Sequence, residues 1–168
     1  AINNADMKSY GWEMELSWRD RINEFNYGVR FTLADGQREV TKYPNESGDI
    51  NTWYAGKLDG TIWGYTTVGI AQTQEEMDAH LANNKPNWGS KWGAGDMMYA
   101  DLNGDGEVTS GSSTLGDHGD LTVIGNSYAR YNFGLTLDGS WKGLDFSVFL
   151  QGVMKRDYWL SGPYFWGA

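Results

Sequence analysis

The chain has 168 residues and a formal net charge of -9, contains no cysteine, and is 40% hydrophobic and 15% aromatic. This size and composition are enough for one folded domain and too rich in aromatics for a disordered chain. The acidic charge argues against nucleic acid as a partner, because phosphate binding needs clustered Lys and Arg. The lack of cysteine excludes a disulfide framework, a thiolate zinc site and a cysteine nucleophile.

Aromatic and glycine residues dominate the composition, with nine Trp, ten Tyr and 23 Gly against three Pro. Aromatic side chains suit a pleated surface and glycines suit turns and bulges, so we expect an all-β chain. The chain contains no run of about 18 apolar residues, and its first residues lack the basic and apolar regions of a signal peptide. Strands are therefore the only elements expected to place this chain in a membrane.

The first predicted element is a hairpin. From Tyr10 to Trp18 every second residue is apolar, and the same alternation returns from Phe25 to Leu33. A period of two gives a strand one apolar and one polar face. The polar residues Asp20–Asn23 are expected to form the connecting turn.

A second hairpin is predicted near the C-terminus. Alternating apolar residues run from Tyr131 to Leu137 and from Leu144 to Leu150, with a turn expected at Asp138–Gly143. Each predicted strand has roughly ten residues, which is long for a soluble sheet and about right for a tilted strand that crosses a bilayer.

About 90 residues of different character separate the hairpins. Within them, Thr73 followed by Glu76 is a capping-box pattern, and it predicts one short helix from about Gln74 to Asn83. If both hairpin turns are short and this middle segment is long, the turns lie on one side and the segment on the other, as in outer-membrane barrels. We therefore divide the chain into a hairpin (1–35), a long extracellular loop region (36–127) and a second hairpin with the start of the next loop (128–168).

The alternation also fits a soluble β-sandwich, whose core is built from the same pattern. Aromatics near the strand ends favour the barrel, because amphipathic rings suit the headgroup level. In a barrel the polar faces would line a watery lumen, and in a sandwich they would face solvent. These polar residues are Glu13, Glu15, Arg19, Arg30, Asn132, Asp145 and Gln151.

A calcium-loop-like pattern lies in the middle segment. Asp101, Asn103 and Asp105 supply oxygens at alternate positions, Gly106 permits a sharp turn, and the carbonyl of Glu107 is the next expected ligand. The position where a bidentate carboxylate would close the shell is Ser112, although Asp96, Asp117 and Asp120 are near in sequence. The alternatives are a structural calcium site and a metal-free turn, since Asn-Gly and Asp-Gly are strong turn formers.

The sequence predicts no enzyme. Its two histidines, His80 and His118, have unlike contexts, and no phosphate loop, serine elbow or HExxH motif is present. Glu13 and Glu15 share a strand face, but alternation alone produces such pairs often. The middle segment also holds tryptophans that would suit either stacking on sugar rings or a small core of the loop's own, namely Trp53, Trp63, Trp88 and Trp92.

Six segments occur in order along the chain: Gly11–Asp20, Ile62–Tyr65, Gln72–Met77, Gly95–Gly106, Ile124–Asn126 and Trp141–Phe146. In that order and at those intervals they resemble the C-terminal half of a SusC/RagA-type TonB-linked outer-membrane transporter. The resemblance extends over essentially the whole chain. One departure is Ser127-Tyr-Ala-Arg130, which stands where the family usually has a Ser/Thr-Pro-Arg turn.

The resemblance implies a large transmembrane β-barrel in the outer membrane of a Gram-negative, Bacteroidota-type bacterium. It implies import of oligosaccharides, or of peptides in some members, with a SusD-like surface lipoprotein as partner. Energy would come from TonB through parts of the parent chain that are missing here, so we expect this chain to be a piece of a longer polypeptide. Four strands do not close a barrel. The alternatives are a soluble, calcium-stabilised carbohydrate-binding β-domain and a purely structural surface domain.

Overall fold

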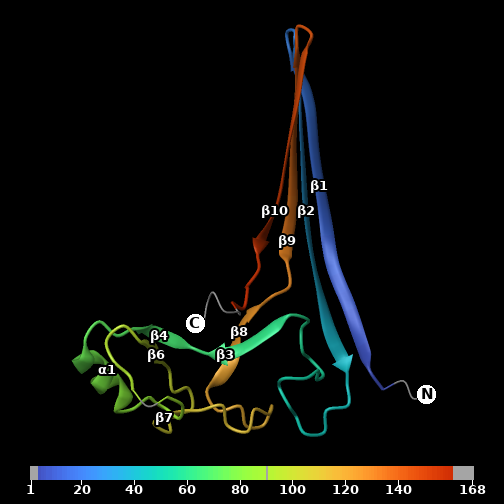
Figure 1. The fold of residues 1–168 in the computed structure, drawn as a ribbon. Coiled ribbons are helices and arrows are strands. Elements are labelled where there is room, and N and C mark those ends of the chain that lie inside the picture. Colours follow the sequence, from blue (N-terminus) through green and yellow to red (C-terminus); the bar gives the residue numbers. More distant parts are fainter. Residues whose placement is uncertain (1–3, 90, 161–168) are drawn as a thin grey trace. The chain divides into compact units, whose positions relative to one another are not determined.

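The computed structural model describes residues 4–89 and 91–160, and Figure 1 shows their course. The described residues form antiparallel β-structure for the most part, with one short helix, which confirms the all-β expectation. The elements are β1 (Asp6–Ile22), β2 (Phe25–Lys42), β3 (Thr61–Tyr65), β4 (Thr67–Ile70), α1 (Gln74–Leu81), β5 (Lys85–Pro86), β6 (Met97–Tyr99), β7 (Glu107–Val108), β8 (Leu121–Asn126), β9 (Arg130–Trp141) and β10 (Leu144–Lys155).

The chain forms two compact units. The first, here called the sheet unit, comprises Met7–Glu39, Leu58–Gly60 and Asn126–Ala168, and the second, the loop unit, comprises Ala1–Asp6, Val40–Lys57 and Thr61–Gly125. The charge is divided unevenly, because the loop unit has 12 acidic against 4 basic residues (net -8) and the sheet unit 10 against 9 (net -1). The acidity of the chain thus belongs almost entirely to the loop unit.

The sheet unit is built on a four-stranded sheet with the order β1-β2-β9-β10. Both predicted hairpins are present, and they stand side by side because β2 pairs antiparallel with β9 in a ladder from Phe25↔Trp141 to Ala34↔Asn132. The long segment between the hairpins therefore leaves and returns at the same end of the sheet, opposite the two turns (Figure 1). This pairing agrees with the parity argument from sequence.

Both turns are shorter than expected. Strand β1 continues to Ile22 and β9 to Trp141, so only two residues, Asn23–Glu24 and Lys142–Gly143, connect each pair of strands. Lys142 and Gly143 both have positive φ, at 47° and 85°. A two-residue turn with positive φ at both positions has a backbone twist that matches the right-handed twist of the flanking strands. This match favours the two-residue turn over a longer one. Strand β2 also runs on to Lys42, past the expected segment boundary at residue 35.

The register gives the sheet two chemically different faces. Opposite residues of an antiparallel ladder point to the same side, so Val29, Leu137 and Val148 form one apolar row. The next apolar row is Phe31, Leu135 and Leu150. The polar residues Asn26, Arg30, Thr32, Asn132, Thr136, Asp138, Ser140, Asp145, Ser147 and Gln151 lie on the opposite side. We call these two sides the apolar face and the polar face.

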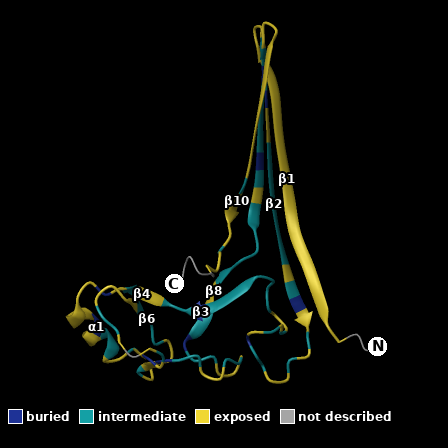
Figure 2. Cartoon of the chain, in the orientation of Figure 1, coloured by how far each residue is buried: buried dark blue, intermediate teal, exposed yellow. Residues whose placement is uncertain are grey.

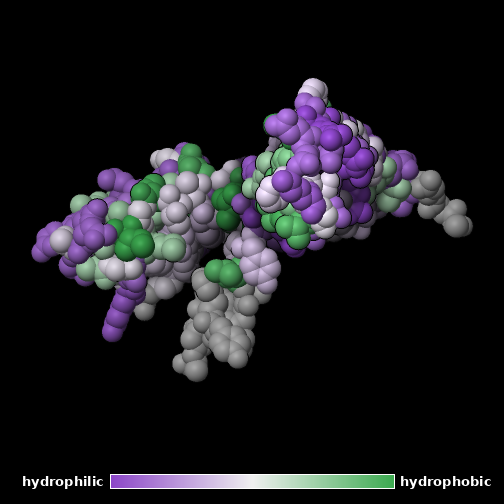
Figure 3. Space-filling view, turned by 90° about the horizontal axis from the view of Figure 1, so that it is seen from above, coloured by the Kyte–Doolittle hydropathy of each residue, from purple (hydrophilic) through white to green (hydrophobic). Residues whose placement is uncertain are grey.

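The apolar face is uncovered. All 17 residues of β1 are exposed, and Figure 2 shows this along the length of the strand. On β10, Phe146 and Leu150 remain 53% and 52% exposed. Seen from the end that carries the turns, the sheet unit shows mostly hydrophilic residues, with hydrophobic ones confined to a smaller area (Figure 3). A sandwich would bury such a face against a second sheet.

The loop unit has regular structure that the sequence patterns did not predict. It contains the two-stranded pairs β3–β8, β4–β6 and β5–β7, the last of them parallel. Its buried apolar residues are Val40, Ile50, Ala71, Met77 and Val108. These few residues, drawn from distant positions, form the interior of the unit.

Helix α1 ends two residues earlier than expected, at Leu81. Thr73 is its N-cap and accepts a hydrogen bond from the Glu76 N–H at 3.2 Å, as the capping box requires. The Glu76 carboxylate reaches back to the N–H of Gln72 at 2.7 Å, one residue before the cap. Met77 is completely buried and anchors the helix. No helix of the described residues has the length and apolarity needed to cross a membrane.

Candidate functional site

The Asp-rich loop, residues 101–107, is held by its own side chains. The two carboxylate oxygens of Asp101 accept hydrogen bonds from the N–H groups of Gly104 at 2.6 Å and Gly106 at 2.7 Å. These bonds, that from Gly106 foremost, lower the pKa of the Asp101 carboxyl. Asn103 accepts from the Asp105 N–H at 2.9 Å, and Asp105 accepts from the Glu107 N–H at 2.8 Å. The four predicted ligand residues thus form consecutive Asx turns.

The parallel pair β5–β7 fixes the exit of this loop. The Lys85 N–H donates to the Gly106 carbonyl at 3.1 Å, and the Asn84 side-chain oxygen accepts from the Asp101 N–H at 3.0 Å. Directly after the loop, Val108 is fully buried. The loop therefore has a defined shape that the interior of the loop unit supports.

Calcium binding at this loop stays a prediction. Within residues 4–89 and 91–160, no three Asp, Glu or His side chains gather as a metal-binding group. The calcium ligands predicted from sequence differ from such a group of charged side chains. One of them is the amide oxygen of Asn103 and another is the backbone carbonyl of Glu107.

Calorimetric titration of EDTA-treated protein with calcium is expected to show binding that Asp101→Asn abolishes, because the first loop position then loses its charge. Glu75→Gln, an equal charge change in helix α1 outside the loop, is the control. The absence of heat at millimolar calcium would show that the loop is a metal-free turn.

Asp120 holds the two ends of the Asp-rich loop together. Its side chain is completely buried, with one oxygen accepting from the N–H groups of Leu102 at 2.7 Å and Asn103 at 3.3 Å. The other oxygen accepts from the Thr109 N–H at 2.7 Å. Asp120 is thus engaged with backbone on both sides of the loop, a role different from the metal coordination considered from its position in sequence.

The segment that leads to Asp120 depends on a second carboxylate. Asp117 accepts from the Ser112 N–H at 3.0 Å, and its hydrogen bonds with Ser112, foremost among the causes, lower its pKa. Because the folded-state pKa lies below the unfolded one, this stabilisation is complete above the unfolded pKa of about 4 and is lost as pH falls through the folded value.

Acidification below about pH 4 is therefore expected to loosen the 112–117 turn. In a metal-free sample, the protection factor of the Ser112 amide, which is its exchange rate relative to the intrinsic rate at the same pH, should fall in this range, and Asp117→Asn should show low protection at every pH. A protection factor that stays constant down to pH 2 would contradict this.

The four predicted tryptophans do not form one surface. Trp88 and Trp92 belong to a cluster with Tyr65 and Tyr99, in which Trp88 stacks on Tyr65 with ring centroids 4.5 Å apart. All four rings are partly buried. These contacts are those of a small aromatic core, which is the second of the two roles considered from sequence.

Trp63 and Trp53 lie elsewhere in the loop unit. Trp63 donates its indole N–H to the Tyr54 hydroxyl at 3.1 Å and lies 5.5 Å from the His118 ring. Trp53 is the more exposed and lies near the Lys57 ammonium, 5.9 Å from its ring centroid. Ligand contact by these tryptophans stays a prediction.

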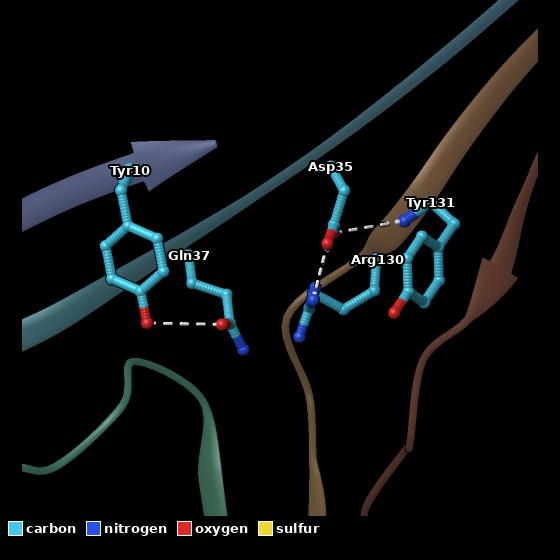
Figure 4. Close-up of polar contacts among 5 residues, drawn as sticks. All are labelled: Tyr10, Asp35, Gln37, Arg130 and Tyr131. Atoms are coloured by element: carbon cyan, nitrogen blue, oxygen red, sulfur yellow. Dashed lines mark hydrogen bonds and ion pairs between the residues drawn. The ribbon is translucent and has the colours of Figure 1, made fainter. Parts of the chain in front are cut away.

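An ion pair that the sequence did not predict lies where β2 and β9 part (Figure 4). Arg130 binds Asp35 through two parallel hydrogen bonds of 2.5 Å, and Asp35 also accepts from the Tyr131 N–H at 3.4 Å. The Asp35 side chain is 8% and the Arg130 side chain 20% exposed. Beside them Tyr10 donates to Gln37, so strands β1, β2 and β9 all carry polar contacts here.

Nearby, a network of polar contacts fixes the return of the chain to the sheet. Arg38 pairs with Asp59 at 2.7 Å and lies 5.2 Å from the Tyr128 ring centroid. The side-chain amide of Asn126 donates to the Asp59 carbonyl at 2.9 Å, and the backbone N–H of Asn126 donates to the Asp157 carboxylate at 2.7 Å. Sequence spacing carries no signal for these contacts, because the partners are far apart along the chain, Asn126 and Asp59 by 67 residues.

Most of the residues that were predicted to line a lumen lie on the same side of the sheet, as their alternation in the sequence indicates. Arg30, Asn132, Asp145 and Gln151 share the polar face, and Glu15 joins them through its ion pair with Arg30 at 2.8 Å. Of three open grooves on the described part of this unit, Arg19 lines one and Glu13 lines the other two. The polar side of the sheet is therefore the hollowed side.

No known family profile matches the chain. The chain is 25% identical over 92% of its length to "TonB-dependent receptor P26" from Formosa agariphila, and the match covers 16% of that protein. The chain thus spans far less than the length of this curated relative. The similarity is thus to part of a protein named as a TonB-dependent receptor.

Proposed function

We propose that this chain is a wall-and-loop segment of a TonB-dependent importer in a Gram-negative outer membrane. The observation that carries the proposal is the sheet with one uncovered apolar face and one hollowed polar face. A strand that separates lipid from a watery lumen needs this alternation along its whole length. The long segment between the hairpins would then leave and rejoin the sheet at its extracellular end.

The edges of the sheet support the same proposal. Strands β1 and β10 each have one side without a partner strand among the described residues. Unpaired backbone groups are not tolerated in lipid, so such edges call for neighbouring strands within a longer closed sheet. The relative, of which the match covers 16%, has ample length for such strands.

The finer assignment rests on the ordered motifs described above. We propose a SusC-like importer of oligosaccharides, or of peptides, that works with a SusD-like surface lipoprotein in a Bacteroidota-type bacterium. Contact with TonB would be made by other parts of the polypeptide. The soluble carbohydrate-binding alternative requires a buried apolar face, and the exposure of Phe146 and Leu150 gives it no support.

Single cysteines can test which face meets lipid, because the chain contains no native cysteine. In the intact protein in outer membranes, cysteines at 146, 148 and 150 should react slowly with a charged maleimide, and cysteines at 145, 147 and 151 should react fast. A bimane fluorophore at the first three positions should be quenched by lipid-borne nitroxide. Reactivity without this period of two would refute the proposal.

A further inference from the structure

One loop of the loop unit is closed around a lysine side chain. Residues 43–57 leave the end of β2 and return to it, because the Val40 N–H donates to the Lys57 carbonyl at 3.0 Å and the Gly56 N–H donates to the Val40 carbonyl at 2.7 Å. Val40 itself and Ile50, within the loop, are buried. A compact surface loop whose ends meet in this way is packed by its own side chains.

The Lys57 ammonium points back into this loop. It donates hydrogen bonds to the carbonyls of Ile50 and Thr52, both at 2.8 Å, seven and five residues before it in the sequence. Its nitrogen also lies 5.2 Å from the ring centroid of Tyr54 and 5.9 Å from that of Trp53. Aromatic rings within about 6 Å of an ammonium attract it through the negative charge of their faces. Two carbonyl oxygens and two rings therefore contact the charge.

Carboxylates do not neutralise this ammonium directly. The ion pairs formed by the described residues do not include Lys57. Burial is the main cause that lowers the pKa of Lys57, and the charge of Asp49 counteracts it. An ammonium withdrawn from water is costly unless other groups replace its hydration. The carbonyls and the rings have to supply this replacement.

The loop also fixes the segment that carries the two acceptor carbonyls. The side-chain amide of Asn45 donates to the carbonyls of Asp49 at 2.9 Å and Trp53 at 3.1 Å, and its oxygen accepts from the Asp49 N–H at 3.0 Å. These bonds hold both ends of residues 49–53 without using the lysine. Acceptors that are already ordered bind a cation at a lower entropic cost.

We propose that these two carbonyls and two rings form a binding site for a primary ammonium group, and that its occupant is the chain's own Lys57. Occupation of the site keeps the 43–57 loop closed. A free alkylammonium ion of matching length takes the place of the side chain when the lysine is shortened. All of these groups belong to the loop unit, so the inference goes beyond the proposed function and does not depend on it.

The test shortens the lysine and returns the missing group as a free molecule. In Lys57→Ala of the intact protein in detergent, the hydrogen-exchange protection of the Asp49 and Gly56 amides should fall about tenfold or more, because bonds to a charged donor are lost. Addition of n-propylammonium chloride, which replaces the deleted carbons and the nitrogen, should restore protection as its concentration rises. Uncharged 1-propanol should not. Potassium chloride at the same ionic strength should not either, since two carbonyls are too few to replace a potassium ion's hydration shell.

Two further variants separate the ammonium from charge and packing in general. Lys42→Ala is the matched control, because Lys42 is an exposed lysine at the end of β2 and its loss removes the same charge. It should change the protection less than about twofold. Lys57→Met keeps the apolar length of the side chain without its nitrogen, and it should open the loop as Lys57→Ala does.

The Thr109 amide, which donates to Asp120, reports whether the rest of the loop unit stays folded, and its protection should remain in every variant. Full protection of the loop in Lys57→Met, or an equal loss in Lys42→Ala, would overturn the site. So would a loss that extends to Thr109, no recovery with n-propylammonium, or equal recovery with 1-propanol or potassium chloride.

Discussion

Replacement of Asp120 by alanine is expected to destabilise the loop unit by about 3 kcal/mol or more. The buried carboxylate accepts three backbone N–H groups, from Leu102, Asn103 and Thr109. Alanine would leave these donors without an acceptor, and each unsatisfied buried donor costs roughly 1–3 kcal/mol. Hydrogen exchange of the Leu102 and Thr109 amides would report the effect locally, as a loss of protection by two orders of magnitude or more.

Asp96→Ala is the control for this prediction. Asp96 is an exposed carboxylate in the same unit and accepts one N–H, that of Gly93, at 2.8 Å. Its replacement removes the same charge but leaves a donor that water can reach, so the protection of Leu102 and Thr109 should remain. Equal losses in the two variants would show that Asp120 acts through charge alone.

Breaking the Asp35–Arg130 pair is expected to cost the sheet unit about 3 kcal/mol. Asp35→Asn leaves the guanidinium without its counter-charge at a site where both side chains are largely buried. Arg130→Lys should also destabilise, because an ammonium group does not reproduce the two parallel hydrogen bonds of the guanidinium. Urea unfolding of the intact protein in detergent would measure both losses.

The Glu15–Arg30 pair offers a matched control in the same sheet. It is also an arginine–carboxylate contact, at 2.8 Å, but both of its side chains are more than half exposed. Glu15→Gln should therefore change the stability far less than Asp35→Asn, since exposed pairs contribute little. A double-mutant cycle on Asp35 and Arg130 that shows no coupling would contradict the proposed role of the pair.

The hairpins follow from local sequence because a period of two assigns each strand residue to a face without knowledge of its neighbours. The α1 cap follows for the same reason, since Thr73 and Glu76 are three residues apart. The turns were placed less well. Asp138 and Gly139 have turn-forming chemistry, yet both remain in the β9 ladder, where Gly139 pairs with Phe146. Pairing across strands overrode the local preference there.

In the Asp-rich loop, too, some features follow from local sequence and others depend on the fold. Its internal turns could be expected from Asp101, Asn103 and Asp105, because each side chain bonds to a backbone group a few residues away. The burial of Asp120 could not be expected, because it depends on where the rest of the loop unit packs. The aromatic cluster is a similar case, since Tyr65 and Trp88 meet only through the fold.

The sequence by itself determined the two-faced strands, the position of the helix and the Asp-rich turns, all of which depend on residues within a few positions of one another. Only the tertiary structure decided that β2 pairs with β9 across almost 90 intervening residues, that the apolar face stays uncovered and that Asp35 meets Arg130. Such contacts depend on closing long loops, whose entropic cost and packing gain are set by the whole fold and leave no local pattern.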